Sequence, residues 1–287
     1  MAYGSFKELL AAAGSTGTLA AAAIAREAQD TGASESDVRV RLASTLEVMG
    51  EAIETGLAGT LRSRSGLVGG DARRVSVSAP RLAGDTFTDV IARAMAVAEV
   101  NACMGRVVAA PTGGASGVLP AVITTMATRL GSPPDALVDA LATAAAIGGV
   151  IAARATLSGA AGGCQAETGS AAAMAAAAAV EMAGGTPEQA GHAAAFAIQG
   201  LMGLVCDPIG GLVEVPCVAR NATGAAISLA AVELALAGVE FPVPLDEVID
   251  AMGQVGRSIP PSLRETARGG LAATPTGRSL AGERPIR

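Results

Sequence analysis

Small side chains dominate this sequence of 287 residues, and large ones are scarce. It contains 66 alanines and 37 glycines, against four phenylalanines, one tyrosine and no tryptophan. Alanine is the best helix former, whereas strands favour β-branched and aromatic side chains. We therefore predict an all-α, multi-helical protein in which small residues pack the helices closely together.

The chain is long enough for one large core, and only 16% of its residues are charged against 51% hydrophobic. Globular domains usually carry roughly 25% charged residues, so most of this chain must face other protein rather than remain disordered. We predict a single domain over residues 1–287. A polar, glycine-rich stretch without periodicity predicts a loop or hinge at 59–85, and we expect a mobile tail after about residue 277.

Cap residues followed by helical spacing predict four helices, beginning near Ser34, Thr86, Ser132 and Thr186. The second should reach about Cys103, and the third should reach about Ala153. Three more apolar segments predict helices at 165–183, 218–236 and 245–255. The first of these is so rich in alanine that it should be a central helix surrounded by others.

Two scarcities limit the chemistry that this chain can perform. Lys7 is the only lysine and His192 the only histidine. Pyridoxal phosphate needs a lysine Schiff base, so we expect no pyridoxal phosphate. A serine hydrolase or a histidine-rich zinc site would depend entirely on His192, which we interpret as a core histidine with a structural role.

The net charge of -6 provides no basic surface for a nucleic acid. The opening residues, MAYGSFKELL, contain no secretory signal, which makes the cytoplasm the expected compartment. The 22 uncharged residues 107–128 have the length of a membrane span, but Pro111 and Pro120 interrupt them. We predict a buried segment of a protein that does not enter the membrane.

Four cysteines in a chain without an export signal indicate reduced thiols, metal ligands or catalytic groups. Cys103 lies in an apolar helical pattern typical of a small buried thiol. Cys164, Cys206 and Cys217 each lie beside glycine or proline where a loop meets a helix, which suits thiolates that converge on a metal cluster. Their spacings of 42 and 11 match no familiar metal motif, so the spacing alone leaves metal ligation and buried structural thiols both open.

Four longer strings carry a resemblance to a known family: PTGGASGVLPAV, GGCQAETGSAAAMAAAA, GLVCDPIGGLVEVPCVARNA and GGLAATPTG. Together they resemble the α subunit of the iron-sulfur L-serine dehydratases, and the likeness runs from the SGLVGGDA segment to TPTG. The resemblance implies a 4Fe-4S cluster held by Cys164, Cys206 and Cys217, whereas Cys103 matches no ligand. One iron would then stay open as a Lewis acid for the elimination of water from L-serine, which gives pyruvate and ammonia.

The resemblance also implies a partner. In this family the expected catalytic histidine lies in an SSSHT-like motif of the β portion, and no such string occurs here. We therefore expect a separate β subunit to complete the active site and supply the base. The single-chain members end in a cysteine that closes the open iron. Because this chain ends in GERPIR, we expect water or a partner residue there instead.

The glycine-rich segment at 111–117, followed by a predicted helix, suits a substrate carboxylate because backbone N–H groups gather at helix N-termini. The candidate substrate contacts are Thr112, Gly113, Gly114, Ser116, Arg220 and Asn221. A tight interhelical turn would explain the same glycines, and Arg220 and Asn221 could instead orient the cluster loop or cap a helix.

Three other functions remain open at this stage. A related cluster enzyme could remove sulfide from L-cysteine. A non-catalytic iron-sulfur redox module would need a fourth ligand, for which Cys103 is the remaining thiol. A helical scaffold with buried thiols would bind no metal.

Overall fold

The computed structural model describes residues 3–79 and 82–282, and within these ranges it has thirteen α-helices and no β-strand. The all-α prediction is confirmed. The helices are α1 (Phe6–Thr16), α2 (Leu19–Thr31), α3 (Glu35–Leu57), α4 (Asp71–Val77), α5 (Gly84–Ala102), α6 (Val118–Leu130), α7 (Pro134–Arg154), α8 (Gly159–Gly162), α9 (Ser170–Met182), α10 (Pro187–Leu201), α11 (Cys217–Leu236), α12 (Leu245–Ser258) and α13 (Pro275–Ala281). Short helical turns are η1 (Gly113–Ala115), η2 (Gln165–Gly169), η3 (Ile209–Gly211), η4 (Pro261–Leu263) and η5 (Gly270–Ala273).

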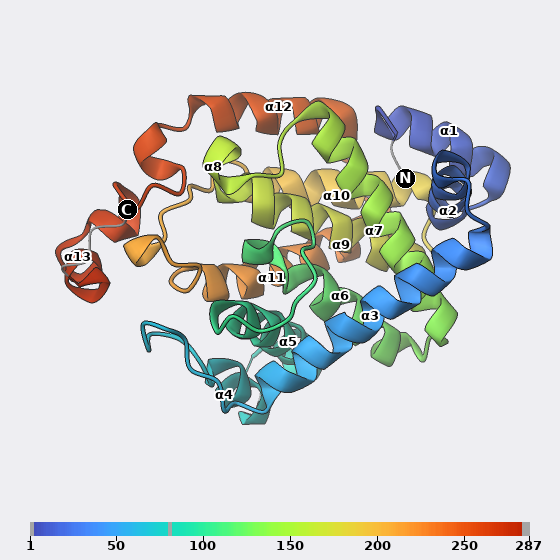
Figure 1. The fold of residues 1–287 in the computed structure, drawn as a ribbon. Helices are drawn as coiled ribbons and strands as arrows, with labels where there is room; N and C mark the ends of the chain where they lie inside the picture. The colour runs from blue at the N-terminus through green and yellow to red at the C-terminus, as the bar shows by residue number, and fades with distance from the viewer. Residues whose placement is uncertain (1–2, 80–81, 283–287) are drawn as a thin grey trace.

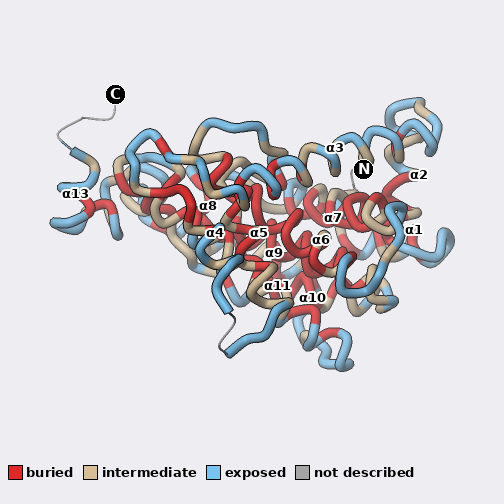
Figure 2. The backbone as a smooth tube through the Cα atoms, turned by 90° about the horizontal axis from the view of Figure 1, so that it is seen from below, coloured by how far each residue is buried: buried red, intermediate tan, exposed pale blue. Residues whose placement is uncertain are grey.

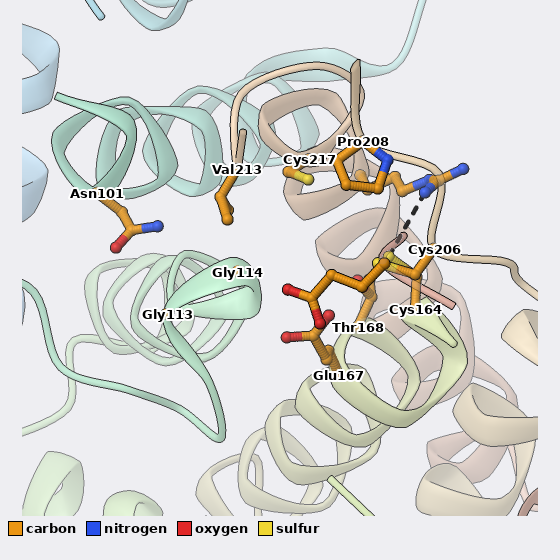
Figure 3. Close-up of a pocket in the computed structure, with 12 residues that line it drawn as sticks. Asn101, Gly113, Gly114, Cys164, Glu167, Thr168, Cys206, Pro208, Val213 and Cys217 are labelled. Atoms are coloured by element: carbon orange, nitrogen blue, oxygen red, sulfur yellow. Dashed lines mark hydrogen bonds between the residues drawn. The ribbon is translucent and has the colours of Figure 1, made fainter. Parts of the chain in front are cut away.

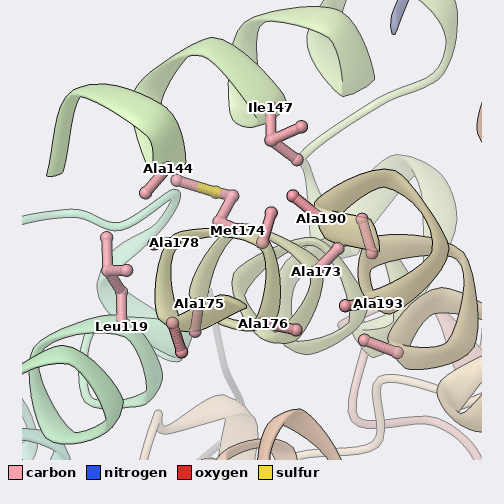
Figure 4. Packing of buried hydrophobic residues seen from close by; sticks show 14 of the residues in the cluster. Leu119, Ala144, Ile147, Ala173, Met174, Ala175, Ala176, Ala178, Ala190 and Ala193 are labelled. Atoms are coloured by element: carbon pink, nitrogen blue, oxygen red, sulfur yellow. The ribbon is translucent and has the colours of Figure 1, made fainter. Parts of the chain in front are cut away.

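Helix α9 is the centre of the molecule, and α6, α7, α10 and α11 pack around it (Figure 1). Every residue from Ser170 to Val180 is buried. Figure 4 shows its alanines facing Leu119 of α6, Ile147 of α7 and Ala190 of α10, and the tube in Figure 2 is buried along this middle layer. The predicted central helix is confirmed, although its first five residues form a π-helical turn, η2, rather than α-helix.

Small residues allow the helices to approach closely. Gly56 of α3 is one example, because a Cβ atom there would lie 2.2 Å from the Ala96 carbonyl oxygen of α5. Real Cβ atoms do not come this close to backbone, so any larger residue would push the two helices apart. Glycine at such positions therefore allows two helices to pack in direct backbone contact.

Helix α7 is long and apolar enough to cross a membrane, judged by length and composition alone, and 61% of its most apolar window is buried inside the protein. Helices α1 and α2 would pass the same test as one bent pair. The core helix of a soluble protein also meets this test, and α7 packs against α2 and α9. Residues 107–128, by contrast, form a loop, η1 and most of the largely buried α6, as predicted.

Two of the predicted helix starts are confirmed as capping boxes, Ser34 with Asp37 and Thr186 with Gln189. The other two predicted caps differ from the observed N-caps by three residues and by one residue. Helix α5 begins at Gly84, where a φ of 73° turns the chain, so Thr86 lies inside the helix. The N-cap of α7 is Pro133 rather than Ser132, whose N–H is bound to the Ala127 carbonyl at the end of α6.

The last two predicted helices agree with the structure to within three residues. Helix α11 begins one residue earlier than predicted, at Cys217, and ends at Leu236 as expected. Helix α12 starts at Leu245 as predicted and runs three residues further, to Ser258.

The predicted loop at 59–85 is irregular over 59–70 but contains α4, so it is a helix over part of its length. Two buried carboxylates hold the irregular part. Glu99 accepts the backbone N–H groups of residues 70–72, and Glu214 accepts the hydroxyls of Ser63 and Ser65. Residues 80–81 lie outside the described residues. The predicted tail begins within α13, and residues 283–287 lie outside the described residues.

Candidate metal and substrate site

One cavity of about 300 Å³ lies beside η2, at the N-terminal end of α9, and the three loop cysteines line it (Figure 3). Cys164 immediately precedes η2, Cys206 follows α10, and Cys217 is the first residue of α11. All three are buried and none forms a disulfide. The full lining is Asn101, Gly113, Gly114, Cys164, Glu167, Thr168, Cys206, Pro208, Val213, Cys217, Arg220 and Glu265.

Two backbone constraints, one local and one long-range, place Cys164 and Cys206 at this cavity. Gly163 has a φ of 77°, and a Cβ atom there would lie 2.9 Å from the Leu204 carbonyl oxygen, so only glycine fits before Cys164. The backbone of Cys206 pairs with the segment after α12, donating to Leu263 and accepting from Glu265 at 2.8 Å each. The cavity thus depends on a contact between segments nearly sixty residues apart in sequence.

The three thiols differ in their acidity. The Cys206 thiol donates a hydrogen bond to the Cys164 sulfur, which lowers the pKa of Cys164 and raises that of Cys206. Nη1 of Arg220, 3.5 Å from the Cys164 Sγ atom, favours the same thiolate. Burial raises the pKa of Cys217 to about 12. Deprotonation is therefore easier at Cys164 than at Cys206 or Cys217, and a metal that binds all three sulfurs would displace any protons that they hold.

Arg220 serves mainly to hold the Cys206 loop. Its guanidinium donates to the Val205 carbonyl at 2.9 Å and forms an ion pair with Asp207 at 2.8 Å. Asp207 in turn accepts the Leu271 N–H at 2.7 Å. Of the alternatives for Arg220, the structure supports orientation of the cysteine loop, with its charge beside Cys164.

The glycine-rich segment gives a mixed result. Gly113 and Gly114 line the cavity. Ser116 and Asn221 are also predicted as substrate contacts, but both are fully buried and neither lines the cavity. The Ser116 hydroxyl donates to the Gly113 carbonyl.

The Asn221 side chain, on α11, is hydrogen-bonded to the glycine-rich turn that contains Gly114 and Gly117. It accepts the Gly117 N–H at 2.9 Å and donates to the carbonyls of Gly114 and Cys217. In this structure both polar side chains are hydrogen-bonded to the glycine-rich turn and lie off the cavity.

Two carboxylates at the cavity were missed by the sequence-based reasoning. Glu167 lies on η2, and one of its oxygens is within 4.8 Å of both the Cys164 and Cys206 sulfurs, a group that could hold a metal ion. Its Oε1 accepts the Thr112 hydroxyl at 2.6 Å, so Thr112 orients Glu167. Burial raises the pKa of Glu167, with a smaller contribution from the charge of Glu265.

Glu265 enters the cavity from the segment after α12, with a φ of 62°. A non-glycine residue in this conformation is strained, and such strain gathers at functional sites. The only sequence signal for Glu167 was its place three residues after Cys164. Nothing local in the sequence indicated Glu265.

The remaining candidates lie away from this cavity. Cys103 follows α5, half-buried, and is absent from the lining. The lone histidine, His192 on α10, accepts the Phe241 N–H at its Nδ1 atom, 3.2 Å away. This bond fits the structural role predicted for His192.

A cavity lined by three buried thiols and two carboxylates, set in an all-α domain, defines a candidate metal-dependent enzyme site. The pattern of the family described as "Serine dehydratase alpha chain" matches residues 12–272, and the chain belongs to this family.

Relatives of two lengths are similar to it. It is 48% identical over 260 residues to the "Probable L-serine dehydratase, alpha chain" of Bacillus subtilis, covering 90% of this chain and 86% of that one. It is 44% identical over 257 residues to the "L-serine dehydratase, alpha chain" of Peptoniphilus asaccharolyticus, covering 88% of each. A longer relative, the "L-serine dehydratase" of Mycobacterium tuberculosis, is 43% identical over 254 residues, which is 83% of this chain but 54% of that protein.

Proposed function

We propose that this chain is the α chain of an L-serine dehydratase, which converts L-serine to pyruvate and ammonia together with a β chain. The observation that carries the proposal is the convergence of Cys164, Cys206 and Cys217 on one buried cavity in a member of the serine dehydratase family. The free thiols suit the reducing cytoplasm, where we place the enzyme.

The residues at the cavity fit a 4Fe-4S cluster, with the three cysteines as its ligands. Thiolates are the usual ligands of such clusters, and the hydrogen bond from Cys206 and the charge of Arg220 lower the pKa of Cys164. Gly159 keeps the space open, because a Cβ atom there would lie 3.4 Å from the Cys206 sulfur and 2.3 Å from Glu167. When bound, the cluster would supply a Lewis acid that makes hydroxide a workable leaving group.

The chain's own residues would bind and enclose the substrate. Gly113 and Gly114 line the wall that would receive the serine carboxylate, across from Glu167 (Figure 3). The buried side chains of Asn221 and Ser116 hold that wall in place. Loss of the α-proton and of the β-hydroxide, which together make one water, leaves aminoacrylate, which tautomerises to an imine and hydrolyses to pyruvate and ammonia. Because His192 accepts a hydrogen bond from Phe241 and lies off the cavity, we assign the base that removes the α-proton to the β chain.

The decisive experiment is an anaerobic assay of pyruvate release by this chain co-purified with its β chain, using L-serine and L-cysteine in parallel. We expect turnover of L-serine, faster than that of L-cysteine, and none when the β chain is omitted. Faster turnover of L-cysteine would indicate a desulfidase instead. Colourless, iron-free protein prepared without oxygen would favour a metal-free scaffold.

The redox-module alternative needs a fully ligated cluster. Cys103 lies off the cavity, and in the part of the chain that the structure describes no fourth thiol lines it. A cluster that survives in the Cys103→Ser variant would count against the redox module, whereas its loss would favour it.

A further inference from the structure

Glu167 occupies a place in the cavity that the proposed reaction leaves unexplained. It lies on η2, a π-helical turn of five residues directly before α9. π-Helical turns are rare in proteins, and those that occur often lie at functional sites, because the added residue redirects the side chains around it. Here the carboxylate lies beside Cys164 and Cys206 (Figure 3), with an oxygen within 4.8 Å of both sulfurs.

The two oxygens of Glu167 have different surroundings. Oε1 accepts the hydrogen bond of Thr112 at 2.6 Å, which fixes the orientation of the carboxylate. Oε2 faces Gly159, where a Cβ atom would lie only 2.3 Å away and also 3.4 Å from the Cys206 sulfur. The missing side chain at residue 159 therefore leaves Oε2 accessible on the side of the thiols.

This carboxylate also lacks a cationic partner. Among the described residues no arginine or lysine forms an ion pair with Glu167, and the nearby Arg220 is paired with Asp207. Glu167 is half-buried, and withdrawing a carboxylate from water without a counter-charge is costly, so such a group is expected to bind a cation or to hold a proton. Two thiols next to it indicate a metal as the cation.

We propose that Glu167 is a fourth protein ligand of the cluster and binds, through Oε2, the iron that no cysteine holds in the enzyme without substrate. The inference rests on the proposed function, since it requires the cluster. Three cysteines for four irons leave one iron to be filled, and Glu167 belongs to this chain. A carboxylate oxygen is a harder ligand than a thiolate, so it suits a position that the substrate must later occupy.

The test compares Glu167→Gln with Glu265→Gln in the complex with the β chain, prepared without oxygen. Both carboxylates line the cavity, but only Glu167 is close to two sulfurs, which makes Glu265 the matched control. Iron and sulfide are measured, and the electron paramagnetic resonance spectrum is recorded after mild oxidation. We expect Glu167→Gln to lose about one iron of four while keeping its sulfide, with the signal of a 3Fe-4S cluster. Glu265→Gln should keep all its iron.

A second variant tests whether the loss of iron comes from the missing carboxylate or from a disturbance that the new glutamine side chain causes. Gly159→Ala would place a methyl group against Oε2 and should lose the same iron, although Glu167 is intact. Circular dichroism checks that the helices persist in all variants.

The outcomes separate this proposal from the one on which it rests. Unchanged iron and sulfide in Glu167→Gln, beside a complete wild-type cluster, would overturn the role of Glu167 alone. Equal iron loss in Glu167→Gln and Glu265→Gln would also overturn it. Wild-type protein without iron and sulfide would overturn the cluster and this ligand together.

Discussion

A half-buried glutamate lies near each end of the central helix, and the two carboxylates have different partners. At the far end, Glu181 accepts the backbone N–H groups of Leu19 and Ala20, at 3.0 and 3.1 Å, and the Thr143 hydroxyl at 3.2 Å. At the cavity end, Glu167 accepts the Thr112 hydroxyl and has an oxygen beside two thiols. Burial is the main cause of a raised pKa at both.

The neighbours of the two carboxylates explain this difference. Glu181 lies at the end of an alanine-packed helix and joins α9 to the start of α2. Both of its carboxylate oxygens accept hydrogen bonds from these neighbours. Glu167 has glycines nearby, since Gly114 and Gly159 would both bring a Cβ atom within 3.2 Å of its oxygens. Alanine closes the space between helices, whereas glycine leaves room for a ligand. The same helix therefore ends in close packing at Glu181 and beside an open cavity at Glu167.

The largest effect should come from removing a thiol at the cavity end. Cys206→Ser should abolish cluster binding and lower serine turnover by more than about 100-fold, since even partners of metal ligands are worth about 10–100-fold. The fold should persist because the core lies along α9, away from this loop. Iron analysis, pyruvate assay and circular dichroism measure the three quantities. Cys103→Ser is the control, and collapse of the helices in Cys206→Ser would contradict the separation of the two regions.

Overfilling the alanine core should give the opposite pattern. Ala176 on α9 is fully buried, so Ala176→Leu should lower the free energy of unfolding by about 1–3 kcal/mol. The matched change Ala230→Leu, at an exposed position of α11, should have little effect, because leucine is nearly as good a helix former. Denaturant unfolding of both variants measures the difference. Equal losses would show that the core is not close-packed around α9.

The smallest expected effect concerns the pH dependence of stability at Glu181. Burial raises its pKa, so the folded protein binds this proton more tightly than the unfolded chain does. The resulting stabilisation is complete below the ordinary glutamate pKa of about 4.3 and is lost as pH rises through the folded value. Glu181→Gln should remove this part of the decline in unfolding free energy with rising pH. Denaturant curves across this range test it, and an unchanged slope would contradict it.

Helix content was predictable because its signals are local. The capping boxes at Ser34 and Thr186 each lie within four residues, and the alanine run of α9 is continuous. Errors arose where a neighbouring element competed for a residue. Ser132 has the chemistry of a cap, yet its N–H completes the end of α6, and Pro133 takes the cap position.

The site was predictable only in part. The cysteines were recognisable from their loops and from the family resemblance. Glu167 gave no comparable signal, because the π-helical turn that aims it at the thiols has no simple pattern in sequence. Glu265 enters the cavity through the pairing of its segment with Cys206, a long-range contact that no local pattern encodes.

The sequence by itself determined that this chain is helical, rich in small packing residues and equipped with three loop cysteines, because propensity, capping and periodicity act over a few neighbouring residues. Only the tertiary structure decided that Cys164, Cys206, Cys217 and two carboxylates line one cavity, while Ser116 and Asn221 became supports of a turn. These placements depend on close contacts between distant helices, where one missing Cβ atom decides whether a space is filled or open.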